Sequence, residues 1–391
     1  MTRRGESPPT IIKLGRGIQR RSEQAFADGR LVVLSAKGVA AAEAALLHAL
    51  PHGRTGSALV INSTEALAAI ALRILCPDLA VHAHFDDAWD LGLAQQTAAR
   101  HPELAPSLAL APDPPDGPWD IIALPSTKAG VADLLRERLA FAVEHLKPGG
   151  LLFTSTDNPR DRFLRDEVVK LFGAATTVPS PSRRRGVAYV ARRLKTVRVR
   201  KRPRERAFTV REGEAELRLV SRPGIFCHGR LDDGTRALLA TADVAGATRI
   251  LDLGCGTGVI GLAAALRCPE ASVTLVDSFA RAIECTRCNI EAAGLEARCE
   301  VLLTADPAAD LAPGYDLVLT NPPYYGNYRI SEAFLTAARA LLVPGGRLIL
   351  VTKGIEWHEA RMGELFGGVA TRQRGGYWLL EARLPAPADP R

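Results

Sequence analysis

Three glycines in the C-terminal half could bring the backbone close to a bound ligand. Gly254, Gly256 and Gly258 are spaced two apart, between the apolar segment 250–253 and a helix that the pattern predicts from Val259 to Arg267. A side chain at such positions would clash with the ligand, and the first N–H groups of the helix can receive a carboxylate. This turn therefore suits a small ligand that carries an anionic end.

Two acidic residues flank the glycine turn. Asp252 precedes the turn and would orient the amino end of the ligand, and Asp277 ends the apolar run 272–276, which is the next predicted strand. An acid at that strand end can accept hydrogen bonds from two ribose hydroxyls, as it does in nicotinamide dinucleotide sites. Asp277 alone therefore does not distinguish between these cofactors. The alternative to a cofactor-binding role is an ordinary Asp that caps the strand end.

A second motif could activate a poorly nucleophilic amine. Asn321, Pro322, Pro323 and Tyr324 follow the apolar run 317–319. The Asn side-chain oxygen and the carbonyl of the first proline can accept two N–H bonds from an amine whose lone pair is delocalised into a ring or carbonyl group. The prolines fix the turn and remove two donors, and the tyrosine offers a flat face for an extruded base. The alternative is an ordinary turn.

The elements that would position these residues occur twice along the chain. Trp119-Asp-Ile-Ile122 matches Tyr315-Asp-Leu-Val318, and Leu146-Lys-Pro-Gly-Gly150 matches Leu342-Val-Pro-Gly-Gly346, both at an offset of 196. Strands alternate with helices in both halves, beginning in the first half with the apolar run 31–34, which predicts parallel sheets with crossover helices. We therefore expect an α/β protein with two tandem Rossmann-like domains.

The first copy lacks the residues that would do chemistry. Sliding it onto the second places Ser63, Glu65 and Leu67 where the three glycines stand, and places Pro125-Ser-Thr127 on the Asn-Pro-Pro motif. Side chains in that turn would keep a ligand away from the backbone. The sequence therefore predicts that the first domain is degenerate and serves substrate binding or stability.

Positive charge is concentrated between the two copies. The chain of 391 residues has a net charge of +7, and the segment 183–206 holds twelve Arg or Lys residues and one acid. Such a segment is typical of a site for a polyanion, with a solvated linker as the alternative. We expect RNA to contact the basic linker 192–206 through five residues: Arg198, Arg200, Lys201, Arg202 and Arg204. The domains are then 1–30, left unassigned, 31–191, the linker 192–206, and 207–391.

The composition fits a cytoplasmic protein without a membrane span. No stretch offers about 20 consecutive apolar residues, the N-terminus has no apolar signal segment, and the seven cysteines have no framework spacing. Cys285 and Cys288 form a single pair within a predicted helix, which favours a structural role over a metal site. We expect no metal.

The two motifs resemble motifs I and IV of the class I methyltransferases that use S-adenosyl-L-methionine to methylate amino groups. Together with the degenerate first copy and the lead-in Pro223-Gly-Ile-Phe226 and Arg230-Leu-Asp-Asp-Gly-Thr235, they resemble the bacterial ribosomal RNA guanine-N2 methyltransferases of the methyltransferase small domain family. The resemblance implies methyl transfer to the exocyclic N2 of a guanine in ribosomal RNA, and we expect 16S before 23S and a monomeric protein. It also implies that Asp306 meets the adenine amino group.

The chain departs from that family at the rim of the target pocket. Tyr324-Tyr325 stands where Phe-His is usual, and Thr352-Lys353 replaces an Asn-containing turn. These departures leave methyl transfer intact and put the base in question. Two other hypotheses stay open. One is a protein glutamine N5-methyltransferase, which uses the same Asn-Pro-Pro-Tyr logic, although its relatives lack the repeat. The other is a non-enzymatic RNA-binding assembly factor with a vestigial pocket.

Overall fold

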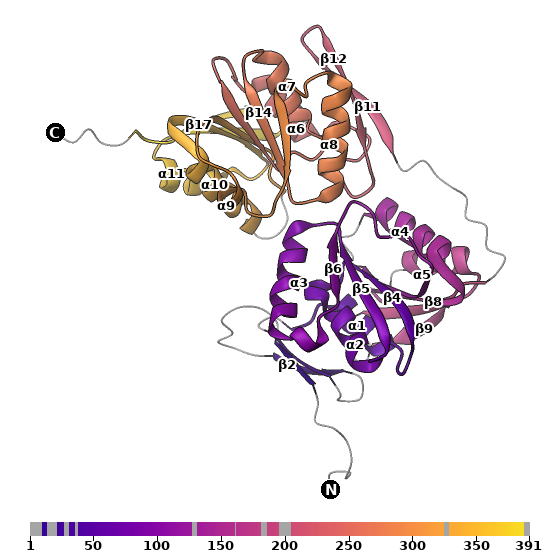
Figure 1. Cartoon of the computed structure of the whole chain (residues 1–391). Helices are drawn as coiled ribbons and strands as arrows, with labels where there is room; N and C mark the ends of the chain where they lie inside the picture. Colours follow the sequence, from indigo (N-terminus) through magenta and orange to yellow (C-terminus); the bar gives the residue numbers. More distant parts are fainter. Residues whose placement is uncertain are drawn as a thin grey trace. The chain divides into compact units, whose positions relative to one another are not determined.

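The chain folds into two α/β units that are described one at a time. The computed structural model describes residues 10–13, 22–26, 31–35, 38–126, 131–160, 162–180, 186–194, 205–323 and 328–386. It divides between Arg202 and Pro203 into two compact units, shown in indigo to magenta and in pink to yellow (Figure 1). Within the described residues, no helix has the length and apolar character that crossing a membrane requires.

The second unit is built on a seven-stranded sheet with the order β15-β14-β13-β16-β17-β19-β18. Five of these strands are parallel, and β19 pairs antiparallel with both β17 and β18. A two-stranded hairpin of β11 and β12 precedes the sheet in the chain. The strands are β11 (Arg206–Glu212), β12 (Ala215–Ser221), β13 (Arg249–Leu253), β14 (Ser272–Asp277), β15 (Cys299–Leu303), β16 (Tyr315–Thr320), β17 (Leu342–Thr352), β18 (Val369–Arg374) and β19 (Tyr377–Arg383).

Helices cover both faces of this sheet, as the buried parallel strands require. Side chains of α6 (Asp233–Thr241), α7 (Val259–Arg267) and α8 (Ala280–Ala293) pack with the hairpin into one core, which Ile250 joins. Side chains of α10 (Arg329–Leu341) and α11 (Ile355–Phe366) form a second core on the other face with Leu251 (Figure 1). Neighbouring residues of β13 thus enter opposite cores, because side chains alternate along a strand. The short α9 (Pro307–Asp310) follows β15.

The first unit repeats this plan. Its seven-stranded sheet has the order β6-β5-β4-β7-β8-β10-β9, with the last two strands antiparallel. The strands are β4 (Gly56–Ile61), β5 (Leu79–Phe85), β6 (Ser107–Leu110), β7 (Trp119–Ser126), β8 (Leu146–Thr156), β9 (Thr176–Pro179) and β10 (Val187–Arg192). The helices are α1 (Ala41–Ala49), α2 (Leu67–Leu75), α3 (Ala88–Arg100), α4 (Ala132–His145) and α5 (Phe163–Phe172), with 3-10 turns at Thr64–Ala66 and Pro102–Leu104. The predicted fold, two tandem Rossmann-like domains, is confirmed.

Strand register gives the equivalence between the copies residue by residue. Ala58 pairs with Ile121 in the first sheet as Ile250 pairs with Leu317 in the second. Residues from α1 to β5 therefore correspond to residues 192 positions later, and residues of β7 and β8 correspond at the predicted offset of 196. Further on the offset shrinks, because Val187 pairs with Thr156 as Trp378 pairs with Thr352. Helices α2 and α7, which begin at Leu67 and Val259, obey the first offset.

One predicted strand belongs to a different sheet. The run 31–34 was expected to open the parallel sheet, but β3 (Leu31–Ser35) pairs parallel with β1 (Thr10–Lys13) and antiparallel with β2 (Ser22–Phe26) in a separate three-stranded sheet. Ile12 and Val33 of this sheet are buried in the core beside α1 and α2. The expectation failed because an apolar run shows that a strand is buried and does not show which strands pair with it.

Candidate active site

The two predicted motifs meet at one edge of the second sheet. β13 lies between β14 and β16, so the chain runs from β13 toward one side of the sheet and later returns to the other. Ligands bind at such a switch point, in the crevice at the carboxyl ends of the strands. The glycine turn follows β13 and Asn321 follows β16, and the Thr320 hydroxyl donates to the Leu253 carbonyl at 2.9 Å. The fold therefore brings together two segments that lie far apart in the sequence.

Each of the three glycines has a positive φ, which strongly favours glycine. These angles are 74° at Gly254, 60° at Gly256 and 79° at Gly258. A Cβ at the first would stand 2.8 Å from the Phe334 ring, and one at the third 2.8 Å from Thr286 Cγ2. At Gly256 the nearest atom would be Ile225 Cγ2, 4.0 Å away. Packing therefore demands glycine at two positions, while the middle one leaves an open cradle where a ligand can touch the backbone.

Asp252 has the properties expected of a partner for a cationic group. Its side chain is fully buried, and Oδ2 accepts a hydrogen bond from the Gly261 N–H at 2.8 Å. Oδ1 has no hydrogen-bond partner among the described residues. Burial raises the pKa of Asp252 to about 7, and the nearby charge of Asp277 adds to the shift. A ligand ammonium beside Oδ1 would supply the missing hydrogen bond and favour the ionised carboxylate.

Asp277 and Asp306 lie at the ends of the two strands beyond β13. The carboxylate of Asp277 accepts from the Gly256 N–H through Oδ2 and from the Phe279 N–H through Oδ1, both at 2.9 Å. These bonds hold the acid against the glycine turn, and carboxylate oxygens have further lone pairs for ribose hydroxyls. Asp306 is exposed, and its Oδ1 caps α9 by accepting from the Ala309 N–H at 3.3 Å. Capping accounts for its observed contact, and its predicted contact with adenine stays a prediction.

The carboxamide of Asn321 is oriented by two acceptors that the motif search did not select. Its Nδ2 donates to Asp232 Oδ2 and to Thr235 Oγ1, both at 2.9 Å. Asp232 also caps α6, because Oδ2 accepts from the Thr235 N–H at 3.0 Å. With the NH2 end tied to these groups, the carbonyl oxygen of the carboxamide points away from them as an acceptor. Asp232 and Thr235 belong to the lead-in that carried the resemblance, and the Asp-x-x-Thr capping pattern was the signal that could have found them.

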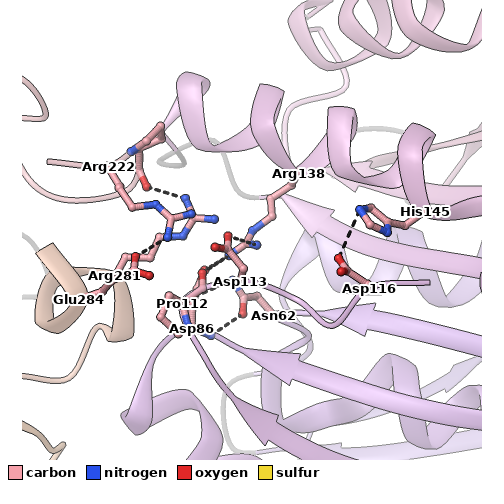
Figure 2. Close-up of polar contacts among 11 residues, drawn as sticks. Asn62, Asp86, Pro112, Asp113, Asp116, Arg138, His145, Arg222, Arg281 and Glu284 are labelled. Carbon is pink, nitrogen blue, oxygen red and sulfur yellow. Dashed lines mark hydrogen bonds and ion pairs between the residues drawn. The ribbon is translucent and has the colours of Figure 1, made fainter. Parts of the chain in front are cut away.

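The segment before α6 is fastened over the glycine turn by two arginines. Arg281 is fully buried and donates to the Pro223 carbonyl at 3.1 Å, and Arg222 forms an ion pair with Glu284 of α8 (Figure 2). These contacts place Ile225 beside Gly256. Nothing in the local pattern pointed to this clamp, since an arginine in such a stretch is usually a surface charge.

Several predicted site residues lie outside the described residues. These are Tyr324 and the neighbouring Tyr325, together with Arg198, Arg200, Lys201, Arg202 and Arg204 of the linker. Of the predicted motif, Asn321, Pro322 and Pro323 are described, and Pro322 is buried. The predicted roles of the undescribed residues stay predictions.

A hollow of about 800 Å³ lies between the hairpin and α6. Its lining includes Arg211, Arg230 and Arg236, whose side chains are exposed, and also Glu212 and Glu216. Arg230 stands two residues before Asp232, which contacts Asn321. The hollow therefore shares the segment before α6 with the contacts of Asn321, and its lining holds more arginines than acids.

The equivalent turn in the first unit is one residue out of step with the predicted alignment. Asn62, Thr64 and Ala66 stand at the positions of the three glycines, not Ser63, Glu65 and Leu67. Asn62 and Ala66 keep the positive φ, 52° and 59°, of the glycines that they replace. The prediction that all three glycines are missing is correct, but the residues predicted to replace them were wrong. Matching the sequences placed the loop one residue too far along the chain, and the strand register corrects this.

A carboxylate from α1 occupies the start of α2 in the first unit. Glu43 is buried, and its Oε1 accepts from the Ser63 hydroxyl at 2.5 Å and from the Ala68 N–H at 3.1 Å. Its Oε2 accepts from the Thr64 N–H at 3.2 Å. Burial raises the pKa of Glu43 to about 7, against the lowering effect of these hydrogen bonds. The protein's own side chain thus takes the helix N-terminus at which the second copy could receive a ligand carboxylate.

An arginine fills the neighbouring space in the first unit. Arg138 of α4 is equivalent to Phe334, and its Nη2 donates to Asp86 Oδ2 at 2.9 Å and to the Pro112 carbonyl at 3.3 Å. Asn62 Nδ2 donates to the same Asp86 carboxylate at 2.8 Å (Figure 2). Both Arg138 and Asp86 are buried. This network and Glu43 leave the first copy of the turn occupied by its own side chains.

Comparisons with known proteins place methyltransferases among those similar to this chain. A family model described as the methyltransferase small domain matches residues 216–381. Ribosomal RNA small subunit methyltransferase C is 37% identical in Hahella chejuensis, over 38% of this chain and 44% of that protein. The Pseudomonas fluorescens protein of the same name is 38% identical, over 44% and 52%. The chain thus spans about half the length of these relatives.

Two further likenesses cover both units. Ribosomal RNA large subunit methyltransferase G of Pseudomonas syringae pv. tomato is 32% identical over 84% of this chain and 88% of that protein. Among solved structures, the T. thermophilus 16S rRNA N2 G1207 methyltransferase in complex with AdoMet and guanosine superposes with a TM-score of 0.73. It is 22% identical, and the match covers 94% of this chain and 98% of that one. At this identity the likeness bears on the fold, and it extends over both domains.

Proposed function

The chain belongs to the methyltransferase small domain family of ribosomal RNA methyltransferases, and we propose that it methylates the exocyclic N2 amino group of a guanine in ribosomal RNA. The methyl donor is S-adenosyl-L-methionine, bound in the second unit. The observation that carries the proposal is the oriented carboxamide of Asn321 beside a glycine turn that has an open cradle at Gly256.

The cofactor residues follow from the contacts of the turn. Gly254, Gly256 and Gly258 would hold the methionine portion, with its carboxylate at the N-terminus of α7. Asp252 would bind the amino group through Oδ1, for which the described residues offer no hydrogen-bond partner. Asp277 would bind the ribose hydroxyls, and Asp306 would meet the adenine amine. When bound, the cofactor supplies an electrophilic methyl group on a positively charged sulfur.

The remaining chemistry is performed by the protein through positioning. The N2 amine of guanine is a weak nucleophile because its lone pair is delocalised into the ring. Asn321 Oδ1 and the Pro322 carbonyl would accept its two N–H bonds and turn the lone pair toward the methyl group. Asp232 and Thr235 keep the carboxamide from flipping, since the amide nitrogen already donates to both. Pro323 removes a competing donor, and Tyr324 would stack on the base.

RNA would be held by positive charge outside the cofactor pocket. The linker residues Arg198, Arg200, Lys201, Arg202 and Arg204 are one candidate contact, and the hollow with Arg211, Arg230 and Arg236 is another. The first unit, with its turn filled, would add surface for the RNA and no second cofactor. We place the enzyme in the cytoplasm, where ribosomal RNA is processed, and expect it to act as a monomer.

The ribosomal subunit is the point on which the relatives differ. We favour 16S RNA because the small-subunit enzymes have the higher identity to this chain, 37% and 38%. The second candidate is 23S RNA, because a large-subunit enzyme matches along 84% of the chain. Both substrates fit the same chemistry, so the assay must include both.

The test is methyl transfer to RNA that lacks the modification. Purified protein and labelled cofactor are incubated with 16S and with 23S RNA from a strain without this gene, as naked RNA and as assembled subunits. Nuclease digestion and mass spectrometry should identify N2-methylguanine in one of them. Finding no N2-methylguanine in any substrate, while S-adenosylhomocysteine still binds, would contradict the proposal. Neutralising the five linker cations should also flatten the salt dependence of RNA binding, with a slope change of about 1 per lost phosphate contact.

A further inference from the structure

Two aromatic rings form a stack at the edge of the sheet that carries Asn321. Tyr328, which precedes α10, and Trp357, in the first turn of α11, lie with ring centroids 4.6 Å apart and planes only 9° from parallel. The proposed methyl-transfer steps do not use them. Their geometry is that of a stacked pair, whose outer faces can extend the stack by a further flat ring.

A buried histidine holds the stack in place. His358 contacts both rings edge-on, at centroid distances of 5.5 Å to Tyr328 and 5.1 Å to Trp357. Its Nδ1 lies 2.8 Å from the Gly354 carbonyl, and its Nε2 lies 3.1 Å from Ser331 Oγ. Burial lowers the pKa of His358, so the ring is neutral near pH 7. A neutral imidazole with both nitrogens engaged anchors the aromatic pair to α10 and to the β17–α11 turn.

Tyr328 is held in a conformation that costs energy and leaves its ring accessible. Its φ is +61°, one of five positive values at non-glycine positions among the described residues. This backbone conformation costs a non-glycine residue on the order of 1 kcal/mol and persists where the surroundings impose it, often at functional sites. The side chain is nevertheless 44% exposed. A tyrosine placed only to fill the core would be buried, so its exposure and its strain point to contact with a partner.

The stack is built on the connections that follow two neighbouring strands, one of which leads into Asn321. β16 and β17 are parallel neighbours with Thr320 opposite Leu350, so their carboxyl ends lie at the same side of the sheet. Tyr328 and Trp357 come from the connections that leave these two strand ends. The exposed Arg329 directly follows Tyr328, and the exposed acid Glu356 directly precedes Trp357. Flat aromatic faces with an arginine beside them suit a nucleotide, whose base stacks and whose phosphate is anionic.

We propose that the Tyr328–Trp357 stack is the binding site for the base of a nucleotide adjacent to the target guanine in the RNA strand. This inference rests on the proposed function, because it assigns a second nucleotide to the same RNA. The target base itself would meet Asn321 and Tyr324, so the stack binds its neighbour. Stacking does not read base identity, so the site fixes the path of the strand and tolerates any base.

The first experiment measures RNA binding without methyl transfer. The probe is a nine-nucleotide single-stranded RNA with one central guanosine, titrated into the full chain while tryptophan fluorescence is recorded. Stacking on the pair should quench Trp357, so Trp357→Phe should remove most of the quench, whereas Trp89→Phe, at a tryptophan that is 59% exposed in the other unit, should keep it. Equal quenching in the two variants would overturn the proposal, whether or not any RNA is methylated.

The second experiment separates stacking from folding. Tyr328→Leu should weaken binding of the probe about 10- to 100-fold, the range for one lost base–aromatic stack, while Tyr328→Phe should bind as the wild type does. S-adenosylhomocysteine affinity should be unchanged in both. Placing an abasic ribose on either side of the guanosine should, at one of the two positions, reduce wild-type affinity as much as Tyr328→Leu does. Loss of cofactor affinity in Tyr328→Leu, or no effect of either abasic site, would show that the pair only supports the fold.

Discussion

The turn after β13 and the turn after β4 have the same fold and opposite contents. In the second unit, Gly254, Gly256 and Gly258 shape a turn that is open at its middle position. In the first unit, the equivalent turn keeps two of the positive φ angles although no glycine remains. The positive φ angles are therefore present without glycine, because the strand before the turn and the helix after it fix the path of the backbone. A turn of this shape is thus no proof of a cofactor site.

The side chains around the two turns explain why only one is open. At an offset of 192, the first unit has Val60 where the second has Asp252, Phe85 where it has Asp277, and Glu43 where it has Thr235. At an offset of 196, Arg138 stands where the second unit has Phe334. The first unit has apolar side chains at the positions of Asp252 and Asp277, and its Glu43 and Arg138 form hydrogen bonds in and beside the turn. In the second unit, the buried Oδ1 of Asp252 has no hydrogen-bond partner within the part of the chain that the structure describes.

Moving the first turn's residues into the second should have the largest effect. Gly254→Asn, Gly256→Thr and Gly258→Ala together should reduce S-adenosylhomocysteine affinity by more than about 100-fold, since new Cβ atoms would meet Phe334 and Thr286 and fill the cradle. Calorimetry measures the affinity. Gly256→Thr alone separates ligand exclusion from misfolding, because no described atom lies within 4 Å of its Cβ except Ile225.

A matched control uses a glycine away from the site. Gly345 has a φ of +80°, and a Cβ added there would meet no described atom within 4 Å, so Gly345→Thr imposes a comparable backbone strain away from the pocket. It should bind S-adenosylhomocysteine as the wild type does. If Gly256→Thr also bound normally, the cradle would not be the cofactor site.

Removing the carboxamide should abolish most of the activity and spare the cofactor. We expect Asn321→Ala to lower kcat about 100- to 1,000-fold, the loss typical of one oriented polar group at a reacting centre, with unchanged S-adenosylhomocysteine affinity. Single-turnover methyl transfer and calorimetry measure the two quantities. A variant that lost cofactor affinity instead would show that Asn321 supports the pocket and does not act on the amine.

Asp232 should act through Asn321, so its effect should be smaller. In Asp232→Asn the acceptor for Asn321 Nδ2 is weakened, and the carboxamide can flip so that its nitrogen faces the substrate. We expect kcat to fall about tenfold with KM for RNA unchanged, as expected when one oriented hydrogen bond is lost. In an Asn321→Ala background the same change should have little further effect. Full additivity of the two losses would refute the positioning role.

The buried acid of the second unit should make cofactor affinity depend on pH. The pKa of Asp252 is raised to about 7, so the carboxyl is largely protonated below pH 7 and ionised above it. A cationic amino group binds the ionised form, so affinity for S-adenosylhomocysteine should rise about tenfold from pH 6 to pH 8. The dependence should disappear in Asp252→Asn. An affinity that fell with rising pH would contradict the assigned contact.

Giving the first turn the glycines of the second should have the smallest effect. Asn62→Gly, Thr64→Gly and Ala66→Gly should leave the binding stoichiometry at one cofactor per chain, because Glu43 and Arg138 still fill the space. Relief of the positive φ at Ala66 should offset part of the entropy cost of the new glycines, so Tm should move by only a few degrees. A stoichiometry of two would show that the glycines alone separate the two copies.

Much of this protein could be predicted from its sequence. The repeated landmarks predicted two domains of one fold, because Lys-Pro-Gly-Gly and Val-Pro-Gly-Gly lie at irregularities of β8 and β17, where Gly149 and Gly345 have positive φ. The glycine turn and Asn321 were found for the same reason, since their chemistry depends on residue types. The predictions that failed concern the pairing of strands. The strand 31–35 belongs to a different sheet, and the turn of the first unit was misaligned by one residue, which only the strand register could reveal.

The order of residue types was enough to predict a cofactor-binding turn in one copy and to show that the other copy lacks its glycines. Only the packing of the folded chain revealed which side chains fill the first turn and which groups hold the Asn321 carboxamide. Glu43 and Arg138 reach the first turn from α1 and α4, on either side of it in the chain, and Asp232 reaches Asn321 across 89 residues. Contacts of this kind depend on where helices pack against a sheet, and the local pattern of residues does not encode that placement.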